Sequence, residues 1–189
     1  LLQTLAMSDY KRTLHLYGPE GTKEALILIQ ELMGKIRVNL AIHEIKPGIA
    51  FETDEVKVEA GAAYHDCPAL TYSFIIKEKQ RLDRTKLKKC KLPNGPLLGE
   101  LAAGKDITHN GKTIKAKSLV YTEPGRKVTI ILDTAYNDLL AAFAKDAQLL
   151  ITESSFADEE QEKAKEYLHL TASQAATIAK KAQAGALIL

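Results

Sequence analysis

The feature that most constrains the fold is a regular alternation of strand and helix patterns in the last third of the chain. Val128 to Leu132 is an uninterrupted apolar run with the length of a buried strand, and a helix pattern follows it over about Asn137 to Asp146. The remaining predicted elements are a strand at Gln148 to Ile151, an acidic helix over about Asp158 to Tyr167, a helix over about Ala172 to Ala182 and a strand at Ala186 to Leu189. This β-α-β-α-α-β order is typical of a layered α/β protein.

The first third of the chain predicts further strands and one helix. Leu14 to Tyr17 alternate apolar and polar residues, and the turn Gly18 to Gly21 leads into a helix whose predicted N-cap is Thr22. Three more strands are expected at Asn39 to Ile45, Glu55 to Tyr64 and Thr71 to Ile76. Near the other end of the chain, Thr171 and Gln174 have capping-box spacing, which predicts a helix that begins at Ala172.

Between these two regions lies a strongly basic segment. Residues 77–117 contain twelve basic and four acidic residues, a net charge of +8, while the rest of the chain carries −6 and the whole chain +2. We interpret residues 77–118 as an arm inserted between two core strands, with a hairpin turn at Asn110-Gly111. A solvated loop with lysines for solubility and an appendage that binds a polyanion both fit this pattern, and the segregation of charge favours the second.

Composition excludes several classes of protein. With 46% hydrophobic and 26% charged residues, the chain has enough apolar side chains for a globular core and is soluble. Its longest apolar runs are far shorter than the ~20 residues that cross a bilayer. Cys67 and Cys90 have no disulfide or metal-motif spacing, so two reduced thiols in the cytoplasm are expected.

Four polar residues stand at equivalent places, next to the ends of predicted elements. His65, Asp133 and Glu153 follow apolar strands, and His169 comes two residues before a predicted helix N-cap. Active sites of layered α/β proteins form where loops from several strands converge at their carboxyl ends. Together these residues predict a histidine and carboxylate metal site with a second histidine beside it.

Several segments resemble the ribonuclease Z family of the metallo-β-lactamase superfamily, and the similarity runs along nearly the whole chain. The most specific matches are Thr152 to Phe156, which resembles His-Glu-Ala-Thr-Phe, and Lys163 to Ala176, which resembles Lys-Ala-x-Glu-Tyr-Gly-His-Ser-Thr-Ala-x-Gln-Ala-Ala. The other matching segments are Leu16 to Gly21, His65 to Tyr72, the glycine and proline motif Gly95 to Gly99, and Arg126 to Thr134.

The resemblance implies a metallo-β-lactamase fold, an α/β four-layer αββα sandwich, with a flexible basic arm. It implies two zinc ions, with manganese or another divalent metal as a substitute, and places His65 and Asp133 as metal ligands, Asp133 bridging the pair. His169 would protonate the leaving 3′ oxygen with Glu153 as its carboxylate partner. The expected substrate is precursor tRNA, cut after the discriminator nucleotide by a homodimer that requires no membrane. Residues of the arm that we expect to contact the tRNA are Gly95, Pro96, Lys86, Lys88 and Lys89.

The chain departs from the family pattern at four positions and lacks two of its motifs. Leu132, Thr152, Leu168 and Leu170 replace glycine, histidine, glycine and serine, although none of these replaces a residue with an assigned chemical role. The family's His-x-His-x-Asp-His motif would precede Leu1 and its last ligand histidine would follow Leu189, so we expect this chain to be a fragment. Two alternatives remain open: a phosphodiesterase of the same fold that acts on small diesters, and a catalytically silent tRNA-binding homologue.

Overall fold

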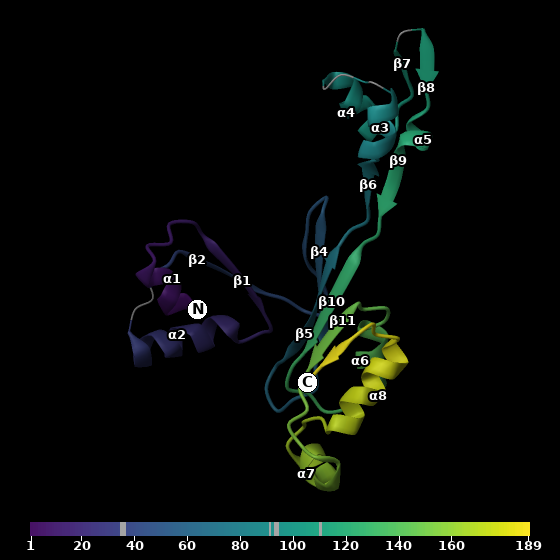
Figure 1. The fold of residues 1–189 in the computed structure, drawn as a ribbon. Helices are drawn as coiled ribbons and strands as arrows, with labels where there is room; N and C mark the ends of the chain where they lie inside the picture. Colours follow the sequence, from purple (N-terminus) through teal and green to yellow (C-terminus); the bar gives the residue numbers. More distant parts are fainter. Residues whose placement is uncertain (35–36, 91, 93–94, 110) are drawn as a thin grey trace. The chain divides into compact units, whose positions relative to one another are not determined.

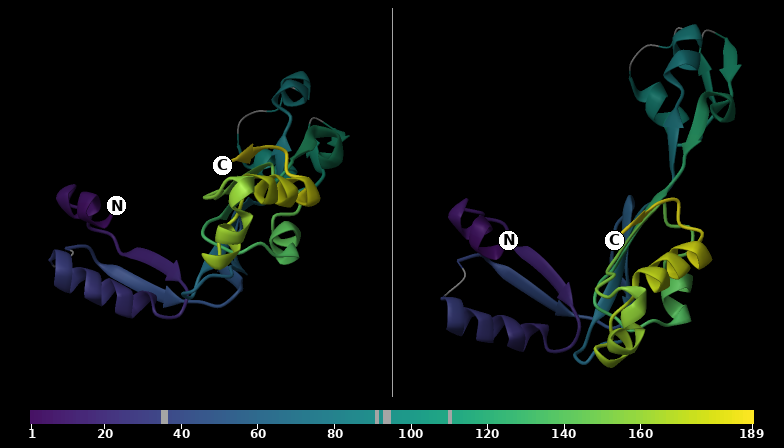
Figure 2. Two further views of the ribbon diagram at one scale, coloured as in Figure 1. Left: turned by 90° about the horizontal axis from the view of Figure 1, so that it is seen from below. Right: turned by 60° about the horizontal axis from the view of Figure 1, so that its bottom comes forward.

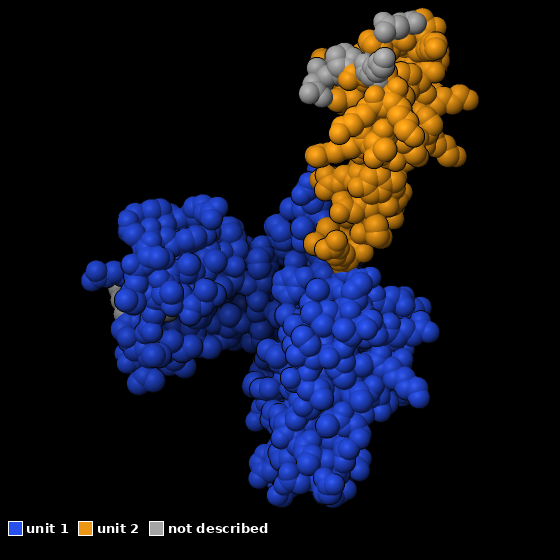
Figure 3. All heavy atoms as spheres, viewed as in Figure 1, with its two compact units in different colours: residues 1–75, 127–189 blue, residues 76–126 orange. Residues whose placement is uncertain are grey.

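The computed structural model describes residues 1–34, 37–90, 92, 95–109 and 111–189, and it divides into two compact units. Unit 1 comprises residues 1–75 and 127–189, and unit 2 comprises residues 76–126 (Figure 3). No helix in the described part of the chain is both long and apolar enough to span a bilayer.

Unit 1 begins with a small parallel strand pair and two helices. Its elements are α1 (Leu2–Met7), β1 (Leu14–Gly18), α2 (Thr22–Met33) and β2 (Leu40–Glu44). The strands β1 and β2 pair in parallel from Leu14 opposite Leu40 to Gly18 opposite Glu44. None of the residues of α2 is buried, and its apolar side chains Ile27, Leu28, Leu32 and Met33 are exposed.

The prediction that Thr22 caps α2 was wrong by one residue. Gly21 is the N-cap, with a left-handed φ of 90°, and Thr22 is the first helical residue. The orphan N–H groups of Gly21 and Lys23 both donate to Glu44 Oε1 at 3.0 Å. A carboxylate from the end of β2 therefore stabilises this helix start, as a negative charge does at a helix N-terminus, and local spacing could not reveal that.

The main sheet of unit 1 has six strands in the order β12-β11-β10-β5-β4-β3 (Figure 1). Their bounds are β3 Gly48–Glu52, β4 Val56–Ala62, β5 Leu70–Ile76, β10 Arg126–Ile131, β11 Leu149–Thr152 and β12 Leu187–Ile188. The strands β10, β11 and β12 are parallel, whereas β3 and β4 form an antiparallel pair with an irregularity between Ile49 and Phe51. Strand β3 was not predicted, and the other five match the expected strands in order and to within a few residues.

Helices α6 (Asp138–Phe143) and α8 (Ala172–Ala182) lie beside each other on one face of this sheet (Figures 1 and 2). Between β11 and α8 the chain forms the 3₁₀ turn η1 (Asp158–Glu160) and α7 (Gln161–Glu166). The predicted capping box is confirmed, because Thr171 Oγ1 accepts from Gln174 N and Gln174 Oε1 accepts from Thr171 N. The N-cap of α8 is thus fixed two residues after His169.

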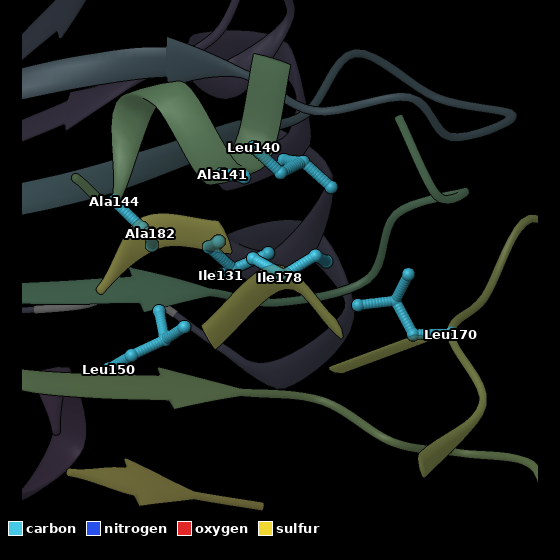
Figure 4. Close-up of a cluster of buried hydrophobic side chains, with 8 residues drawn as sticks. All are labelled: Ile131, Leu140, Ala141, Ala144, Leu150, Leu170, Ile178 and Ala182. Atoms are coloured by element: carbon cyan, nitrogen blue, oxygen red, sulfur yellow. The ribbon is translucent and has the colours of Figure 1, made fainter. Parts of the chain in front are cut away.

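The core of unit 1 joins the parallel strands to these two helices. Ile131 and Leu150 project from β10 and β11 into a cluster with Leu140 and Ile178, each of which is at most 1% exposed (Figure 4). The remaining members of the cluster are Ala141, Ala144, Leu170 and Ala182. Apolar side chains on both strands and helices bury each other here, which is the physical reason for the alternation in the sequence.

Unit 2 has its own small core, which the sequence analysis did not anticipate. Its buried cluster is Leu101, Ile107, Ala116 and Leu119. The elements around it are β6 (Lys79–Leu82), α3 (Arg84–Cys90), α4 (Pro96–Ala102), β7 (Ile107–His109), β8 (Lys112–Ile114), α5 (Ala116–Leu119) and β9 (Val120–Glu123). Strands β7 and β8 form an antiparallel hairpin, but Asn110 of the predicted turn lies outside the described residues.

Candidate active site

The loops that carry His65 and Asp133 are held together by hydrogen bonds between their neighbours. Thr134, which is fully buried, accepts from the backbone N–H of Tyr64 at 2.8 Å, and Ala135 N donates to Tyr64 O at 2.7 Å. Because Tyr64 precedes His65 and Thr134 follows Asp133, these bonds bring the loop after β4 against the end of β10. The sequence predicts His65 and Asp133 at the ends of strands, and in the structure these two strand ends are hydrogen-bonded to each other.

Glu153, directly after β11, links three parts of the site. Its Oε1 accepts from Thr134 N at 3.2 Å, from His169 Nδ1 at 3.0 Å and from Leu170 N at 3.1 Å, while its Oε2 accepts from Ser155 N at 3.0 Å. Burial by itself raises the pKa of the Glu153 carboxyl, but the hydrogen bonds from Ser155, Thr134 and His169 outweigh it and hold this pKa below its ordinary value. Glu153 is therefore ionised at neutral pH.

His169 is oriented by this carboxylate and by the backbone on either side of it. An ionised carboxylate only accepts hydrogen bonds, so the N–H of His169 Nδ1 donates to Glu153 Oε1. The other ring nitrogen, Nε2, is then the one that can contact a substrate. His169 N donates to Ala164 O at 2.8 Å, and the next residue, Leu170, is fully buried in the core. The backbone that carries the imidazole is thereby fixed, and the hydrogen bond to Glu153 fixes the ring itself.

The four predicted residues meet in one place. Asp133, Glu153 and His169 each offer a ligand atom within 4.8 Å of the others, and the His65 ring lies edge-on to the His169 ring with centroids 5.2 Å apart. His65 Nδ1 is buried and has no hydrogen-bond partner among the described residues. Carboxylate oxygens and imidazole nitrogens are the ligands that zinc and related divalent ions take, so the donor set fits a metal. The division of these residues into metal ligands and proton donors stays a prediction.

Cys67 lies beside His65 and belongs to a second group of possible metal ligands. Its sulfur, His65 and the carboxylate of Asp66 form a second group whose ligand atoms lie within 4.8 Å of one another. Cys67 and Asp66 are both exposed. The sequence analysis treated Cys67 as a reduced thiol and left it out of the ligand set, although it stands two residues from His65.

The departures from the family pattern are accommodated in different ways. Leu132 has a side chain that is 60% exposed and does not take a positive φ, so its backbone needs no glycine. Thr152 is buried in the sheet, paired with Ile131 across β10. Leu170 is a core residue, whereas Leu168 takes a left-handed φ of 58°, a conformation that favours glycine.

Two aromatic residues beside His169 carried no role in the sequence analysis. The Phe156 ring lies 6.0 Å from the His169 ring, and the Tyr167 ring stacks on Phe156 with centroids 6.2 Å apart and an interplanar angle of 14°. Both residues lie inside the two most specific matching segments. Only the fold shows that these segments place their aromatic rings together.

The predicted contacts of the arm all lie in unit 2. Lys86, Lys88 and Lys89 are on α3, and Gly95 and Pro96 form the N-cap and first residue of α4. A groove within the unit is lined by basic, acidic and apolar residues and one aromatic ring, among them Lys79, Arg84, Lys88, Asp83, Glu123, Leu87 and Tyr121. This groove belongs to unit 2 alone and includes none of the four predicted site residues, Glu153 among them.

The six-stranded sheet with histidines and carboxylates beyond its strand ends defines a class of protein: the chain has the metallo-β-lactamase fold. It aligns over 98% of its length with the metallo-β-lactamase fold protein YhfI from Bacillus subtilis at a TM-score of 0.58 and 16% identity. It aligns over 98% of its length with the short form of human tRNase Z at a TM-score of 0.61 and 20% identity, covering 62% of that chain. No protein-family model matches the chain.

Within this class the chain is a relative of ribonuclease Z, as its motifs indicated. It is 35% identical over 193 aligned positions to the ribonuclease Z of Methanosarcina acetivorans, which covers all of this chain and 63% of that protein. It is 33% identical to the ribonuclease Z of Nanoarchaeum equitans, over 93% of this chain and 55% of that protein. The chain thus spans about three fifths of the length of these curated relatives.

Proposed function

We propose that the protein is a zinc-dependent endoribonuclease that removes the 3′ trailer from precursor tRNA in the cytoplasm by hydrolysis after the discriminator nucleotide. The observation that carries this proposal is the Glu153–His169 pair, held by four hydrogen bonds beside Asp133 and His65, in a chain similar along its whole length to proteins named ribonuclease Z. The names of the relatives support the substrate class, and the Glu153–His169 contact supports the proposed proton transfer.

His65 and Asp133 would hold the metal. Bound metal would supply an activated water and neutralise charge on the attacked phosphate. Glu153 keeps the Nδ1 proton of His169 in place and orients the ring, so Nε2 of His169 would face the departing 3′ oxygen and deliver a proton to it. The carboxylate of Glu153 therefore sets the orientation of the proposed acid.

The test is cleavage of a 3′-extended precursor tRNA by the full-length protein with zinc or manganese. We expect a single cut after the discriminator, and a loss of at least about 10²-fold in rate for Asp133→Ala and for His169→Ala. Asp138→Ala is the matched control, because Asp138 is an exposed carboxylate whose partners, Lys181 and Tyr136, are not among the four site residues. A protein that binds tRNA tightly without cutting it would support the silent homologue instead.

The arm is proposed to hold the tRNA through Lys86, Lys88, Lys89, Gly95 and Pro96. We expect the triple alanine variant of the three lysines on α3 to bind precursor tRNA more weakly and with a shallower dependence on salt. Binding with fewer phosphate contacts releases fewer counterions from the RNA. If the triple variant cleaves small diesters and precursor tRNA with unchanged relative efficiency, the small-diester alternative is favoured. The proposed homodimer is tested by sedimentation of the full-length protein.

A further inference from the structure

Tyr167 presents an aromatic face to solvent beside the proposed acid. Its side chain is 58% exposed, although burying an aromatic ring is usually favourable. The ring is not isolated, because it stacks on Phe156 with centroids 6.2 Å apart and an interplanar angle of 14°. The offset between the rings leaves part of the Tyr167 face uncovered.

Both rings stand on backbone that the fold holds firmly. Phe156 N donates to Leu170 O, and Ala172 N donates to Phe156 O, each at 3.2 Å, which ties this segment to the start of α8. Tyr167 is the C-cap residue of α7, and its N–H donates to Lys163 O at 2.8 Å. The rings are therefore pre-organised for contact with a flat group, with little ordering left to occur on binding.

The aromatic pair lies beside His169 through its Phe156 ring. Phe156 is 6.0 Å from His169, which on the proposed mechanism protonates the leaving 3′ oxygen. That oxygen belongs to the discriminator nucleotide, so the base of this nucleotide is the one that comes within reach of the aromatic pair.

We propose that Tyr167, supported by Phe156, is a positioning residue on which the base of the discriminator nucleotide stacks. The inference rests on the proposed function and adds a substrate contact to it. Every base has a π face, so a stacking contact tolerates all four bases at this position. It aligns the 3′ oxygen with His169 without reading the sequence of the tRNA.

The experiment compares two substrates and four proteins. The substrates are a 3′-extended precursor tRNA and the same RNA with an abasic discriminator, and the full-length proteins are wild type, Tyr167→Ala, Tyr167→Phe and Leu139→Ala. Leu139 is also an exposed apolar side chain, on α6 and not among the four site residues, and controls for the removal of exposed apolar surface. On the normal substrate we expect Tyr167→Ala to lower kcat/KM by about tenfold, with little effect of Tyr167→Phe or Leu139→Ala.

The abasic substrate separates stacking from a structural role. If Tyr167 stacks on the base, wild type and Tyr167→Ala should cleave the abasic RNA at the same rate, because the contact is already absent. An equal tenfold loss on both substrates, or no loss on either, overturns the assignment while the proposed function stands. A wild type that cuts neither substrate overturns the proposed function and this inference with it.

A second measurement does not depend on catalysis. With 2-aminopurine in place of the discriminator base, binding to the inactive Asp133→Ala variant should quench the fluorescence of the probe by stacking. The quench should disappear when Tyr167→Ala is added to that variant, while binding of the RNA persists. A quench of the same size in both proteins would overturn the assignment.

Discussion

Leu168 takes a left-handed backbone conformation directly before His169, with a φ of 58°. A left-handed conformation costs a residue with a Cβ about 1–2 kcal/mol, whereas glycine adopts it freely but loses more entropy on folding. We expect Leu168→Gly to raise the free energy of unfolding by about 0.5–1 kcal/mol, measured by urea denaturation.

Gln183 provides the matched comparison for this substitution. It is exposed at the end of α8 and has a φ of 55°, so Gln183→Gly relieves the same strain away from the site. A similar gain for both variants would locate the effect in the backbone. If Leu168→Gly instead lowers stability while Gln183→Gly raises it, the Leu168 side chain contributes packing that exceeds its strain.

The low pKa of Glu153 makes stability depend on pH. A carboxyl whose pKa is lower in the folded state contributes stability above its unfolded pKa of about 4.3, and this contribution is lost as the pH falls through the folded pKa. We expect Glu153→Gln to lower stability at pH 7 by about 1–3 kcal/mol, since it weakens several partly buried hydrogen bonds. The difference from wild type should shrink as the pH falls from the unfolded pKa through the lower folded pKa of the wild-type carboxyl.

The control for this pH series is Glu162→Gln, which changes an exposed carboxylate at the start of α7. It should leave the pH dependence of the urea midpoint close to that of wild type. A Glu153→Gln variant with the full wild-type pH dependence would show that other carboxyls account for the acid sensitivity.

At the scale of elements, Gly61 in β4 is required for the packing of α6 against the sheet. A Cβ at this position would stand 2.6 Å from Thr71 Oγ1 and 2.8 Å from a ring carbon of Phe143. Because both neighbours are side chains of packed elements, we expect Gly61→Ala to cost about 1–3 kcal/mol of unfolding free energy. Loss of amide protection in β4 and α6 should accompany it.

Gly99 is the contrasting case. It lies within α4, and a Cβ there would meet nothing within 4 Å. Gly99→Ala should therefore stabilise α4 by about 0.5–1 kcal/mol, because glycine is a poor helix former. Increased amide protection in α4 checks this, and reduced protection would contradict it.

The elements that could be predicted from sequence are those whose signals are local. The apolar run of β10 and the capping box of α8 depend on neighbouring residues only, and both are confirmed. Strand β3 was missed because Gly48 to Glu52 is short and its pairing with β4 is interrupted. The cap of α2 was misplaced because Glu44, from another element, supplies it.

In the candidate site, too, the local signals could be predicted and the contacts between distant residues could not. Its four residues could be selected because each follows a strand or precedes a helix, but the hydrogen bonds that gather them on Glu153 join residues far apart in the chain. The Phe156–Tyr167 stack was missed for a similar reason, since eleven positions and a helix separate the two rings.

For the whole molecule, the two separate cores predict two separable folding units. Leu101 is fully buried in unit 2, and Leu150 is fully buried in unit 1. Each Leu→Ala substitution should cost about 2–5 kcal/mol, and amide exchange should report the loss only in the unit that contains it. If Leu101→Ala removed protection from β10 and β11 as well, the chain would unfold as one cooperative body.

The way in which unit 2 joins the chain has a consequence for how such proteins diversify. Strands β6 and β9 pair from Lys79 opposite Glu123 to Leu82 opposite Val120, and at their base a Cβ on Gly125 would stand only 2.7 Å from Ile76 O. The chain therefore leaves and re-enters at nearly the same point, and closing the loop costs almost the same whatever its length. Insertions or deletions beyond this stem should therefore leave the six-stranded sheet of unit 1 unchanged.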